Sequence, residues 1–585
     1  MANYSTPGVY IEEISKLPAS VAPVATAIPA FVGYTEKSVK KGVTLPANTP
    51  VRITSLLEYE EIFGKAFDEA LTVTLTGTGV TEEKTSIAVA ATTKLSPYIL
   101  YYNLVMYFAN GGGPCYVVSV GTYTPDPVPA DPSTLISLGA LQAGLAAVEK
   151  EDEVTLLVVP DAIILNAAGR KTINDDMLTQ CSVQQDRFAL IDARVLGGTV
   201  FDDGVGFRAD VGADYLKYGA CYYPSLKTTI DLNFEDSGIA ITDSRTGAVF
   251  TGGRSLDDVN NGIAAAVAAT GTIAVDDYNL LAGDVVTING HDFTEGVDWN
   301  AGSTNIQAAT SLHTAITSYA DAAYTATRVS GIITLTANTA GATGNSITLA
   351  YTDNGDAGII ISGANLAGGS NGVAPDKTLY NNIVKEIKKL YKITLYPSSA
   401  MAGVFARVDY ERGVWKAPAN VSLRLVKEPT VLVTHEQQMD MNVDATSGKS
   451  INIIRKFAGK GSIVWGARTL AGNDNEWRYV PVRRFYNFVE ESVKKATEFV
   501  VFEPNDAKTW LRTKTMIENF LVTLWRQGAL AGAKTDEAFF VKVGLGETMT
   551  ALDILEGRMN VEIGMAVVRP AEFIILKFSH KLQES

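Results

Sequence analysis

The chain has 585 residues, which at roughly 150 residues per domain corresponds to about four compact units. Its 49 Lys and Arg residues and 64 Asp and Glu residues give a formal net charge of −15. This charge argues against a general nucleic-acid binder, because such proteins present a basic face to phosphates. Hydrophobic residues make up 46% of the chain, enough for a sizeable core. The sequence shows neither a signal-peptide pattern at its start nor 18 uninterrupted apolar residues, so we expect a soluble protein made in the cytoplasm, without membrane insertion.

The charge is distributed unevenly along the chain. From Asp376 to the C-terminus there are 30 Lys and Arg against 24 Asp and Glu, a net charge of +6, so residues 1–375 carry −21. The chain therefore combines an acidic body with a mildly basic C-terminal third. The positive excess in that third favours an acidic partner surface.

Residues 1–35 are predicted to form an extended N-terminal arm and the start of the core. Strand-like composition begins with Val9, Tyr10, Ile11 and Glu12, and the prolines that follow exclude a helix. A segment of this kind gains backbone hydrogen bonds by adding to the edge of another sheet, in the same chain or in a neighbour. Residues 36–94 are predicted to follow as a β-rich outer segment.

Residues 95–230 alternate between helical and strand-like patterns, which predicts a middle α/β domain. The expected helices cover residues 99–108 and 134–149, the second with Ser133 as its N-cap, and the expected strands cover residues 116–120, 154–159, 188–191 and 218–223. Apolar strands that alternate with helices are typical of a buried parallel sheet. The widely spaced cysteines are interpreted as buried apolar residues without a disulfide or a zinc site; they are Cys115, Cys181 and Cys221.

Residues 231–374 are rich in Gly, Ala, Thr and Asn and are predicted to form an inserted, β-rich, acidic surface domain. Strands are expected over residues 284–288, 332–336 and 346–350, with turns at Asn289-Gly290 and Asn354-Gly355 and one helix near residues 306–322. Nine acidic residues and one Arg lie between Asn261 and Pro375, so the domain should be well solvated.

Residues 375–570 are predicted to form a C-terminal core domain, followed by a C-terminal arm strand within residues 571–585. A basic helix is expected over residues 379–392, and two long helices over residues 483–500 and 505–525. The last of these carries basic side chains in a pattern usual for a solvated face, namely Lys508, Arg512 and Lys514. An apolar run of strand length near the chain end consists of Phe573, Ile574, Ile575 and Leu576.

Motifs for metal, cofactor or nucleotide binding are nearly absent. The four histidines form no metal-ligand or nucleophile pattern, so neither a metal nor a cofactor is expected; they are His291, His313, His435 and His580. Residues 447–450, Ser-Gly-Lys-Ser, resemble the end of a phosphate-binding loop, but Val443 occupies the position of its first glycine. Nucleotide binding is therefore not expected.

Two carboxylates leave an enzymatic interpretation open. Asp161 and Asp192 each lie near the C-terminal end of an expected α/β strand, where ligands of open parallel sheets bind. They could act as general acid and base in a hydrolytic or phosphoryl-handling enzyme. However, Asp161 follows Pro160 and could simply end its strand, and Arg194 lies close to Asp192, so a structural role is favoured for both.

Motifs near both ends of the chain follow one another in a distinctive order. They are TPGVYIEE at 6–13, TAIPAFVG at 26–33, AGVFARVD at 402–409, GVWKAPAN at 413–420, VWGARTL at 464–470, FEPN at 502–505 and PAEFIIL at 570–576. Together they resemble the contractile tail sheath proteins of phages and related contractile injection systems.

The resemblance implies a non-enzymatic, multidomain α/β (α+β) protein whose C-terminal core is completed by the N-terminal arm. Sheaths of this family are homo-oligomers of stacked hexameric rings in a helical array around an inner tube, and they contract to drive the tube through a target envelope. The implied partners are further copies of the chain, the inner tube protein, the baseplate and the tail terminator or cap proteins. The implied location is a phage tail or another contractile particle.

The resemblance also implies roles for individual segments. Both arms are expected to donate strands to neighbouring subunits, through residues 9–12 and 573–576. Lys508, Arg512 and Lys514 are expected to face an acidic inner tube, and the insertion is expected to decorate the outer surface. Two alternatives remain: the enzyme that uses Asp161 and Asp192, and a sheath-like adhesin whose acidic insertion binds a cation or a glycan.

Overall fold

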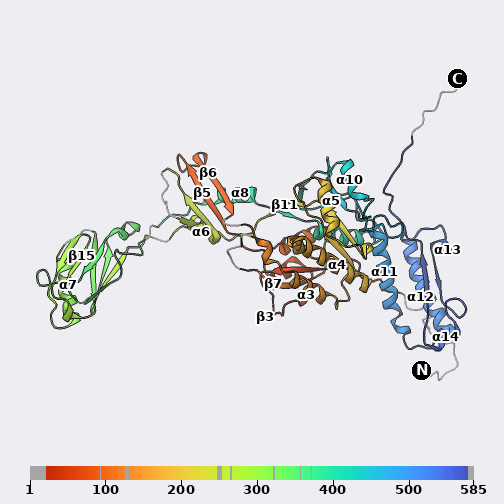
Figure 1. Ribbon diagram of the computed structural model, residues 1–585, viewed down its shortest axis with the longest axis horizontal. Coiled ribbons are helices and arrows are strands. Elements are labelled where there is room, and N and C mark those ends of the chain that lie inside the picture. Colours follow the sequence, from red (N-terminus) through yellow and green to blue (C-terminus); the bar gives the residue numbers. More distant parts are fainter. Residues whose placement is uncertain are drawn as a thin grey trace, which may run out of the picture. The chain divides into compact units, whose positions relative to one another are not determined.

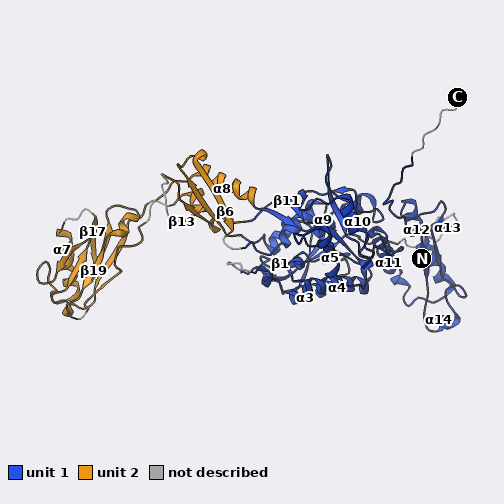
Figure 2. Cartoon of the chain, turned by 45° about the horizontal axis from the view of Figure 1, so that its top comes forward, with its two compact units in different colours: residues 1–67, 93–233, 391–585 blue, residues 68–92, 234–390 orange. Residues whose placement is uncertain are grey.

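The computed structural model describes residues 21–91, 94–124, 129, 131–246, 253–263, 266–319, 323–355, 357–369 and 372–577. The chain divides into two compact units (Figure 2). Unit 1 contains residues 1–67, 93–233 and 391–585, and unit 2 contains residues 68–92 and 234–390. Both units mix helices and strands, as the sequence predicts (Figure 1).

A nine-stranded sheet forms the centre of unit 1. In spatial order its strands are β22 (Val421–Ser422), β25 (Gly461–Val464), β24 (Asn452–Phe457), β10 (Gly219–Tyr223), β9 (Phe188–Asp192), β8 (Leu156–Val158), β1 (Pro29–Thr35), β7 (Cys115–Thr122) and β4 (Pro50–Ile53). The strands from β24 to β7 run parallel, and the outer ones are antiparallel. β7, β8, β9 and β10 confirm the predicted parallel layer.

β1, which lies between β8 and β7, was not predicted from the sequence. All seven of its residues are buried, and Ala30 to Gly33 pair in parallel with Tyr116 to Ser119. Strands from the N-terminal, middle and C-terminal parts of the sequence therefore share one sheet.

Helices supply the apolar side chains that cover the two faces of this sheet. One core cluster includes residues of α1 (Leu56–Phe63), α2 (Leu100–Ala109) and α9 (Ser398–Arg412), and it takes Phe31 from β1. The other includes residues of α3 (Leu138–Val148), α4 (Ala167–Gln184), α5 (Val200–Ala209) and α10 (His435–Asn442), and it takes Ala30 and Val32. This alternation follows from the two-residue period of a strand. Cys115, Cys181 and Cys221 are buried and unpaired, as predicted.

The start of α3 differs from the prediction. Its N-cap is Ser137, whose Oγ accepts a hydrogen bond from the amide of Ala140 at 3.3 Å. Ser133 instead lies in a separate 3₁₀ turn, Pro132–Leu135, which Asp131 caps. Pro132 suits the first position of that turn because no backbone N–H is needed there. The assignment of Ser133 as the helix N-cap was wrong.

The remainder of unit 1 contains two small sheets and a C-terminal helical region. The small sheets are β21 (Lys392–Leu395) with β11 (Leu226–Asp231) and β23 (Val426–Pro429), and the hairpin β2 (Val39–Lys40) with β3 (Val43–Thr44). The C-terminal region contains α11 (Val480–Thr497), α12 (Ala507–Arg526), α13 (Thr535–Ala538), β26 (Phe539–Lys542), α14 (Ala551–Leu555) and β27 (Glu562–Met565). α11 and α12 confirm the two long predicted helices.

Unit 2 contains one four-stranded sheet with two helices and a second group of strands around its own core. The first sheet consists of β13 (Gly253–Ser255), β12 (Ile239–Asp243), β5 (Leu71–Gly77) and β6 (Thr85–Ala91), with helices α6 (Leu256–Asn261) and α8 (Lys377–Leu390). α8 is the predicted basic helix, except that Lys392 belongs to β21.

The second group of strands in unit 2 lies within the stretch 231–374, which the sequence predicts to be an inserted β-rich domain. Its sheets are β17 (Tyr324–Val329), β18 (Ile332–Ala337), β14 (Thr270–Val275) and β20 (Ile359–Ile361), and β16 (His291–Thr294), β15 (Val285–Ile288) and β19 (Leu349–Thr352), with helix α7 (Asn305–Ser318). Asn289 and Gly290 connect β15 to β16 with φ of 50° and 81°, as a tight hairpin turn requires. Among the residues that the structure describes, no helix is both long and apolar enough to span a membrane.

Candidate assembly interface

The C-terminal segment, residues 571–577, pairs with no strand in the described part of the chain. Its four consecutive apolar side chains, Phe573 to Leu576, are 71%, 79%, 81% and 72% exposed. Because successive residues of a strand point to opposite faces, such a run needs cover on both sides. The predicted strand over these residues therefore does not form in the single chain, because no neighbouring strand supplies hydrogen-bond partners for its backbone.

An apolar groove with a volume of about 870 Å³ lies beside β27 in unit 1. Its lining includes Val561, Ile563 and Met565, alternate residues on or just before β27, together with side chains of α11 and α12 such as Val493 and Ile517. β27 pairs with β26 on one side, and no other strand in the described residues pairs with it. Side chains of both strands pack in one apolar cluster with α11 and α12. The groove can therefore cover one face of a third strand added beside β27.

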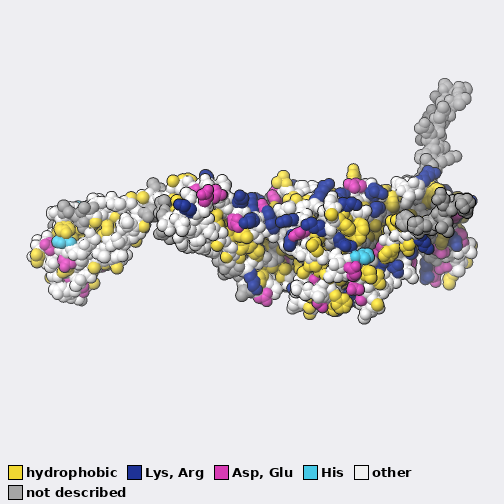
Figure 3. Space-filling model, turned by 90° about the horizontal axis from the view of Figure 1, so that it is seen from above, with side chains coloured by type: hydrophobic (Ala, Val, Ile, Leu, Met, Phe, Trp, Pro, Cys, Tyr) yellow, Lys and Arg dark blue, Asp and Glu magenta, His cyan; other side chains and the backbone are white. Residues whose placement is uncertain are grey.

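The basic residues predicted to contact a partner lie on α12. Lys508 and Arg512 are exposed, and the Arg512 guanidinium lies 4.6 Å from the ring centre of Phe499. Lys514 is partly exposed, with its Nζ 4.0 Å from Glu518. The buried face of the same helix is apolar. Figure 3 shows that Lys and Arg side chains are numerous on one face of unit 1.

The predicted strand residues of the N-terminal arm, Val9, Tyr10, Ile11 and Glu12, lie outside the described residues. The described chain begins at Val21, which is buried in a cluster with Phe485 and Phe488 of α11. The amide of Val24 donates to Ser492 Oγ at 3.2 Å, and Arg484 Nη2 donates to the carbonyl of Thr26 at 2.6 Å. The first described residues after the N-terminal arm, 21–26, are called its root here, and they run along α11.

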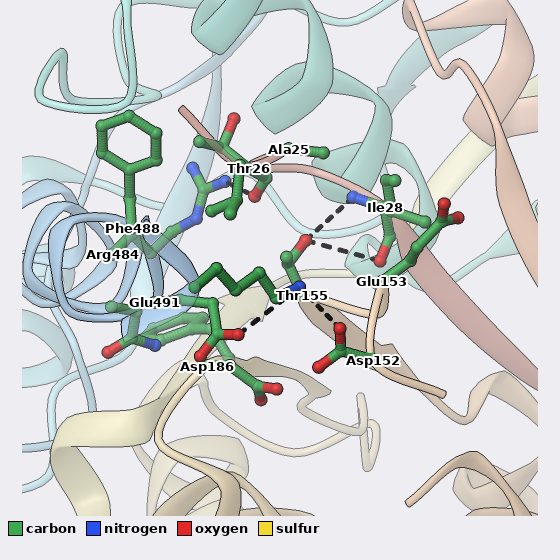
Figure 4. A pocket seen from close by; sticks show the side chains of 14 residues that line it. Ala25, Thr26, Ile28, Asp152, Glu153, Thr155, Asp186, Arg484, Phe488 and Glu491 are labelled. Carbon is green, nitrogen blue, oxygen red and sulfur yellow. Dashed lines mark hydrogen bonds and ion pairs between the residues drawn. The ribbon is translucent and has the colours of Figure 1, made fainter. Parts of the chain in front are cut away.

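A cavity of about 230 Å³ lies between this root and α11 (Figure 4). The amide of Ile28 donates to Thr155 Oγ1 at 2.9 Å on one side of it. Its four carboxylates all have cationic partners: Asp152 with Lys495, Glu153 with Arg52, Asp186 with Arg187, and Glu491 with Lys494. No carboxylate that lines this cavity is therefore left without a cationic partner.

Asp161 and Asp192 are both engaged by backbone amides. Asp161 is fully buried, and its Oδ2 accepts a hydrogen bond from the amide of Tyr34 at 2.9 Å. Asp192 caps the start of α9, because Oδ1 and Oδ2 accept from the amide and hydroxyl of Ser398 at 2.8 and 2.6 Å. Burial raises the pKa of each carboxyl to about 7.

The surroundings of these carboxylates leave little room for a substrate. The cavity that Asp192 lines has a volume of about 10 Å³, at the lower limit for a single water. Lys449, from the loop that resembles a phosphate-binding motif, is buried, and its Nζ donates to the carbonyl of Arg208 at 2.8 Å. No group of three or more His, Cys, Asp or Glu within the described ranges is placed to hold a metal ion. The geometry thus favours structural roles for these residues.

Comparison with known proteins connects the C-terminal region to one family. Residues 472–581 match the phage tail sheath C-terminal domain. The tail sheath protein of Vibrio phage KVP40 is 24% identical over 181 residues, which are 30% of this chain and 25% of the length of that relative.

Solved structures resemble the chain along nearly its whole length. The sheath of the extracellular contractile injection system PVC, in its contracted state, is 26% identical, with a TM-score of 0.52 and coverage of 99% of each chain. A chain of the anti-feeding prophage baseplate is 27% identical, with a TM-score of 0.51 and coverage of 99% of this chain and 100% of that one. The contracted helical sheath of the anti-feeding prophage is 26% identical, with a TM-score of 0.50 and the same coverage.

Proposed function

We propose that this chain, a member of the contractile tail sheath family, polymerises with further copies of itself into a tubular sheath and has a structural, not a catalytic, role. Hexameric rings stack around an inner tube, and contraction drives the tube through a target envelope. The other partners are the baseplate and the tail terminator or cap proteins. The particle is a phage tail or an extracellular contractile particle.

The exposed C-terminal segment carries the proposal. Four large apolar side chains in a row cost free energy in water, at about 1.5–3 kcal/mol for each that could be buried. A polymer supplies the missing cover, because each copy offers a segment at one place and a groove at another. The segment of one copy is therefore assigned to the groove beside β27 of the next.

Strand addition suits a sheath that changes shape. Main-chain hydrogen bonds between an added strand and β27 do not depend on the side chains around them, so neighbouring subunits stay joined while other contacts rearrange. The N-terminal arm, residues 9–12, is assigned the same role toward another copy. The described residues that follow the arm, from Val21 to Val24, contact α11 in the same helical region.

The basic face of α12 is assigned to the inner tube, and the β-rich insertion to the outer surface of the sheath. Exposed ion pairs contribute only about 0–1 kcal/mol each, which suits a contact that must break during contraction. Lys508 and Arg512 are free to meet an acidic surface because both are exposed. The insertion, residues 231–374, has fifteen acidic residues against three Arg, so it suits a solvated position.

Reversing the charge of the α12 face is expected to separate tube binding from self-assembly. With Lys508→Glu and Arg512→Glu together, electron microscopy should show several-fold fewer sheaths assembled around the inner tube, while sheath protein alone still forms tubes. Lys40→Glu with Lys41→Glu, exposed in the β2–β3 hairpin, is the matched control. Unchanged sheaths around the tube would rule out the α12 contact, and a wild-type chain that forms no tubes would rule out the sheath function.

A further inference from the structure

The carboxylate of Glu572 fixes the start of the C-terminal segment, residues 571–577, to unit 1. Glu572 accepts hydrogen bonds from Arg468 Nε at 2.9 Å and Arg468 Nη2 at 2.6 Å. It also accepts from Asn442 Nδ2 at 3.0 Å and from the Tyr479 hydroxyl at 3.1 Å. A bidentate ion pair between a guanidinium and a carboxylate is the strongest and most directional kind of ion pair in proteins.

Arg468 is itself fixed to the central sheet. Its side chain is 4% exposed, and that of Glu572 is 21% exposed. The Arg468 amide donates to Asn452 Oδ1 at 2.7 Å, and Asn452 Nδ2 donates back to the Arg468 carbonyl at 2.7 Å. Since Asn452 begins β24, the carboxylate of Glu572 is connected through two residues to the nine-stranded sheet. Burial opposes ionisation here, but the hydrogen bonds from Arg468 and Asn442 prevail and hold the pKa of Glu572 below its usual value.

The chain differs sharply on the two sides of Glu572. Before it, two backbone hydrogen bonds connect the chain to the helical region. The amide of Ala531 donates to the carbonyl of Ala566 at 2.7 Å, and the amide of Val568 donates to the carbonyl of Ala529 at 3.2 Å. After it, residues 573–577 are all exposed. Glu572 therefore marks the point where the segment leaves unit 1.

We propose that the contact between Glu572 and Arg468 is an anchor, which sets the direction in which the C-terminal segment leaves unit 1 and transmits a pull on that segment to the central sheet. This inference rests on the proposed donation of the segment to a neighbouring copy. Glu572 and Arg468 are positioning residues in it, because neither needs to touch the neighbour.

The path of force explains why an anchor is needed at this point. When one copy pulls on the inserted segment of another, the pull runs back along residues 573 to 566. Without the anchor it would act on the exposed hydrogen bond from Arg569 to the carbonyl of Asn475, then on the short pairing of residues 566–568, and then on β27, the strand beside the groove that receives the next copy. With the anchor it passes through Arg468 and Asn452 into β24. A pull on the C-terminal segment of one copy then does not reach β27 of that copy. The groove beside β27 therefore keeps the strand that it has received from another copy.

Neutralising the anchor is expected to weaken tubes more than it weakens the folded chain. Glu572→Gln keeps the shape of the side chain but loses the charge, so we expect a rise of at least about tenfold in the protein concentration needed to form tubes. After a fixed shear treatment, electron microscopy should show clearly shorter tubes. The unassembled chain should also unfold at a lower temperature, because Arg468 loses its charged partner, so assembly is compared at a temperature at which both chains are folded. Glu61→Gln, an exposed substitution on α1, away from the groove, is the matched control.

A second variant keeps the test decisive if Glu572→Gln folds poorly. Arg468→Lys keeps the positive charge but cannot form the bidentate ion pair. It should therefore give an intermediate rise in the protein concentration needed to form tubes. Combining the two substitutions should weaken tubes less than the sum of the single effects, because both remove the same contact. Wild-type assembly and shear resistance in Glu572→Gln or Arg468→Lys would overturn the anchor alone. A wild-type chain without tubes would instead overturn the proposed function.

Discussion

A chain that ends at Glu572 is expected to fold as the full chain does and to form no tubes. Phe573 to Leu576 are exposed in the single chain, so their removal takes little away from its core. In a polymer the same residues would each bury apolar surface worth about 1.5–3 kcal/mol, together with the main-chain bonds of an added strand. Circular dichroism would check the fold, and sedimentation with electron microscopy would check assembly.

A chain that ends at Lys577 is the control for this truncation, because it retains the whole apolar run. It is expected to assemble as the full chain does. Normal tubes from the chain that ends at Glu572 would contradict the assignment of residues 573–576 to the contact between copies. Loss of the folded state in that chain would contradict the conclusion that these residues lie outside its core.

Replacement of Arg484 by Ala is expected to cause a large loss of stability. The Arg484 side chain is 3% exposed and that of its partner Asp409 is 6% exposed, with the two joined by hydrogen bonds of 2.6 and 3.0 Å. Removing one member of a buried ion pair leaves the other unpaired, at a cost of about 3–5 kcal/mol. The substitution also frees the carbonyl of Thr26, so the root of the N-terminal arm should loosen.

The free energy of unfolding of the unassembled chain in urea measures this effect. Arg526→Ala, an exposed substitution in the last turn of α12, should change it by no more than about 0.5 kcal/mol. The double variant Arg484→Met with Asp409→Leu should recover much of the loss, because it leaves no unpaired buried charge. A loss below about 1 kcal/mol in Arg484→Ala would show that the pair is not coupled to the fold in this way.

Local sequence patterns predicted the elements whose signal is strong by itself. Runs of apolar residues predicted β7 to β10, and α11 and α12 were predicted as two long helices, the second of which ends before Gly528. β1 was missed because its sequence, Pro-Ala-Phe-Val-Gly-Tyr-Thr, gains its strand conformation from β7 and β8 on either side. The N-cap was placed at Ser133 instead of Ser137 because the sequence pattern did not reveal the separate turn that begins at Pro132.

The roles of the candidate site residues depended on contacts between distant parts of the chain. Asp192 was considered as a catalytic group, but it caps a helix that begins 206 residues later at Ser398. The motifs at 464–470 and 570–576 were both recognised, yet no spacing rule could join Arg468 to Glu572 across 104 residues. The tube contact of α12 and the domain boundaries drawn from composition remain predictions.

Insertion of the C-terminal segment of one copy into the groove of another is tested most directly by a disulfide between them. Ile574→Cys would be combined in turn with Val561→Cys, Ile563→Cys or Met565→Cys, since adjacent strands bring Cα atoms within the 4.4–6.8 Å or so that a disulfide spans. The native cysteines are buried and should not interfere. Ile574→Cys with Val183→Cys, exposed on α4, is the control.

Under mild oxidation, at least one of the three groove pairs should give a ladder of covalent dimers, trimers and longer multimers that collapses on reduction. The single variants and the α4 control should remain monomeric on the same gel. Absence of multimers from all three pairs, in samples where electron microscopy shows tubes, would contradict the insertion of the C-terminal segment beside β27.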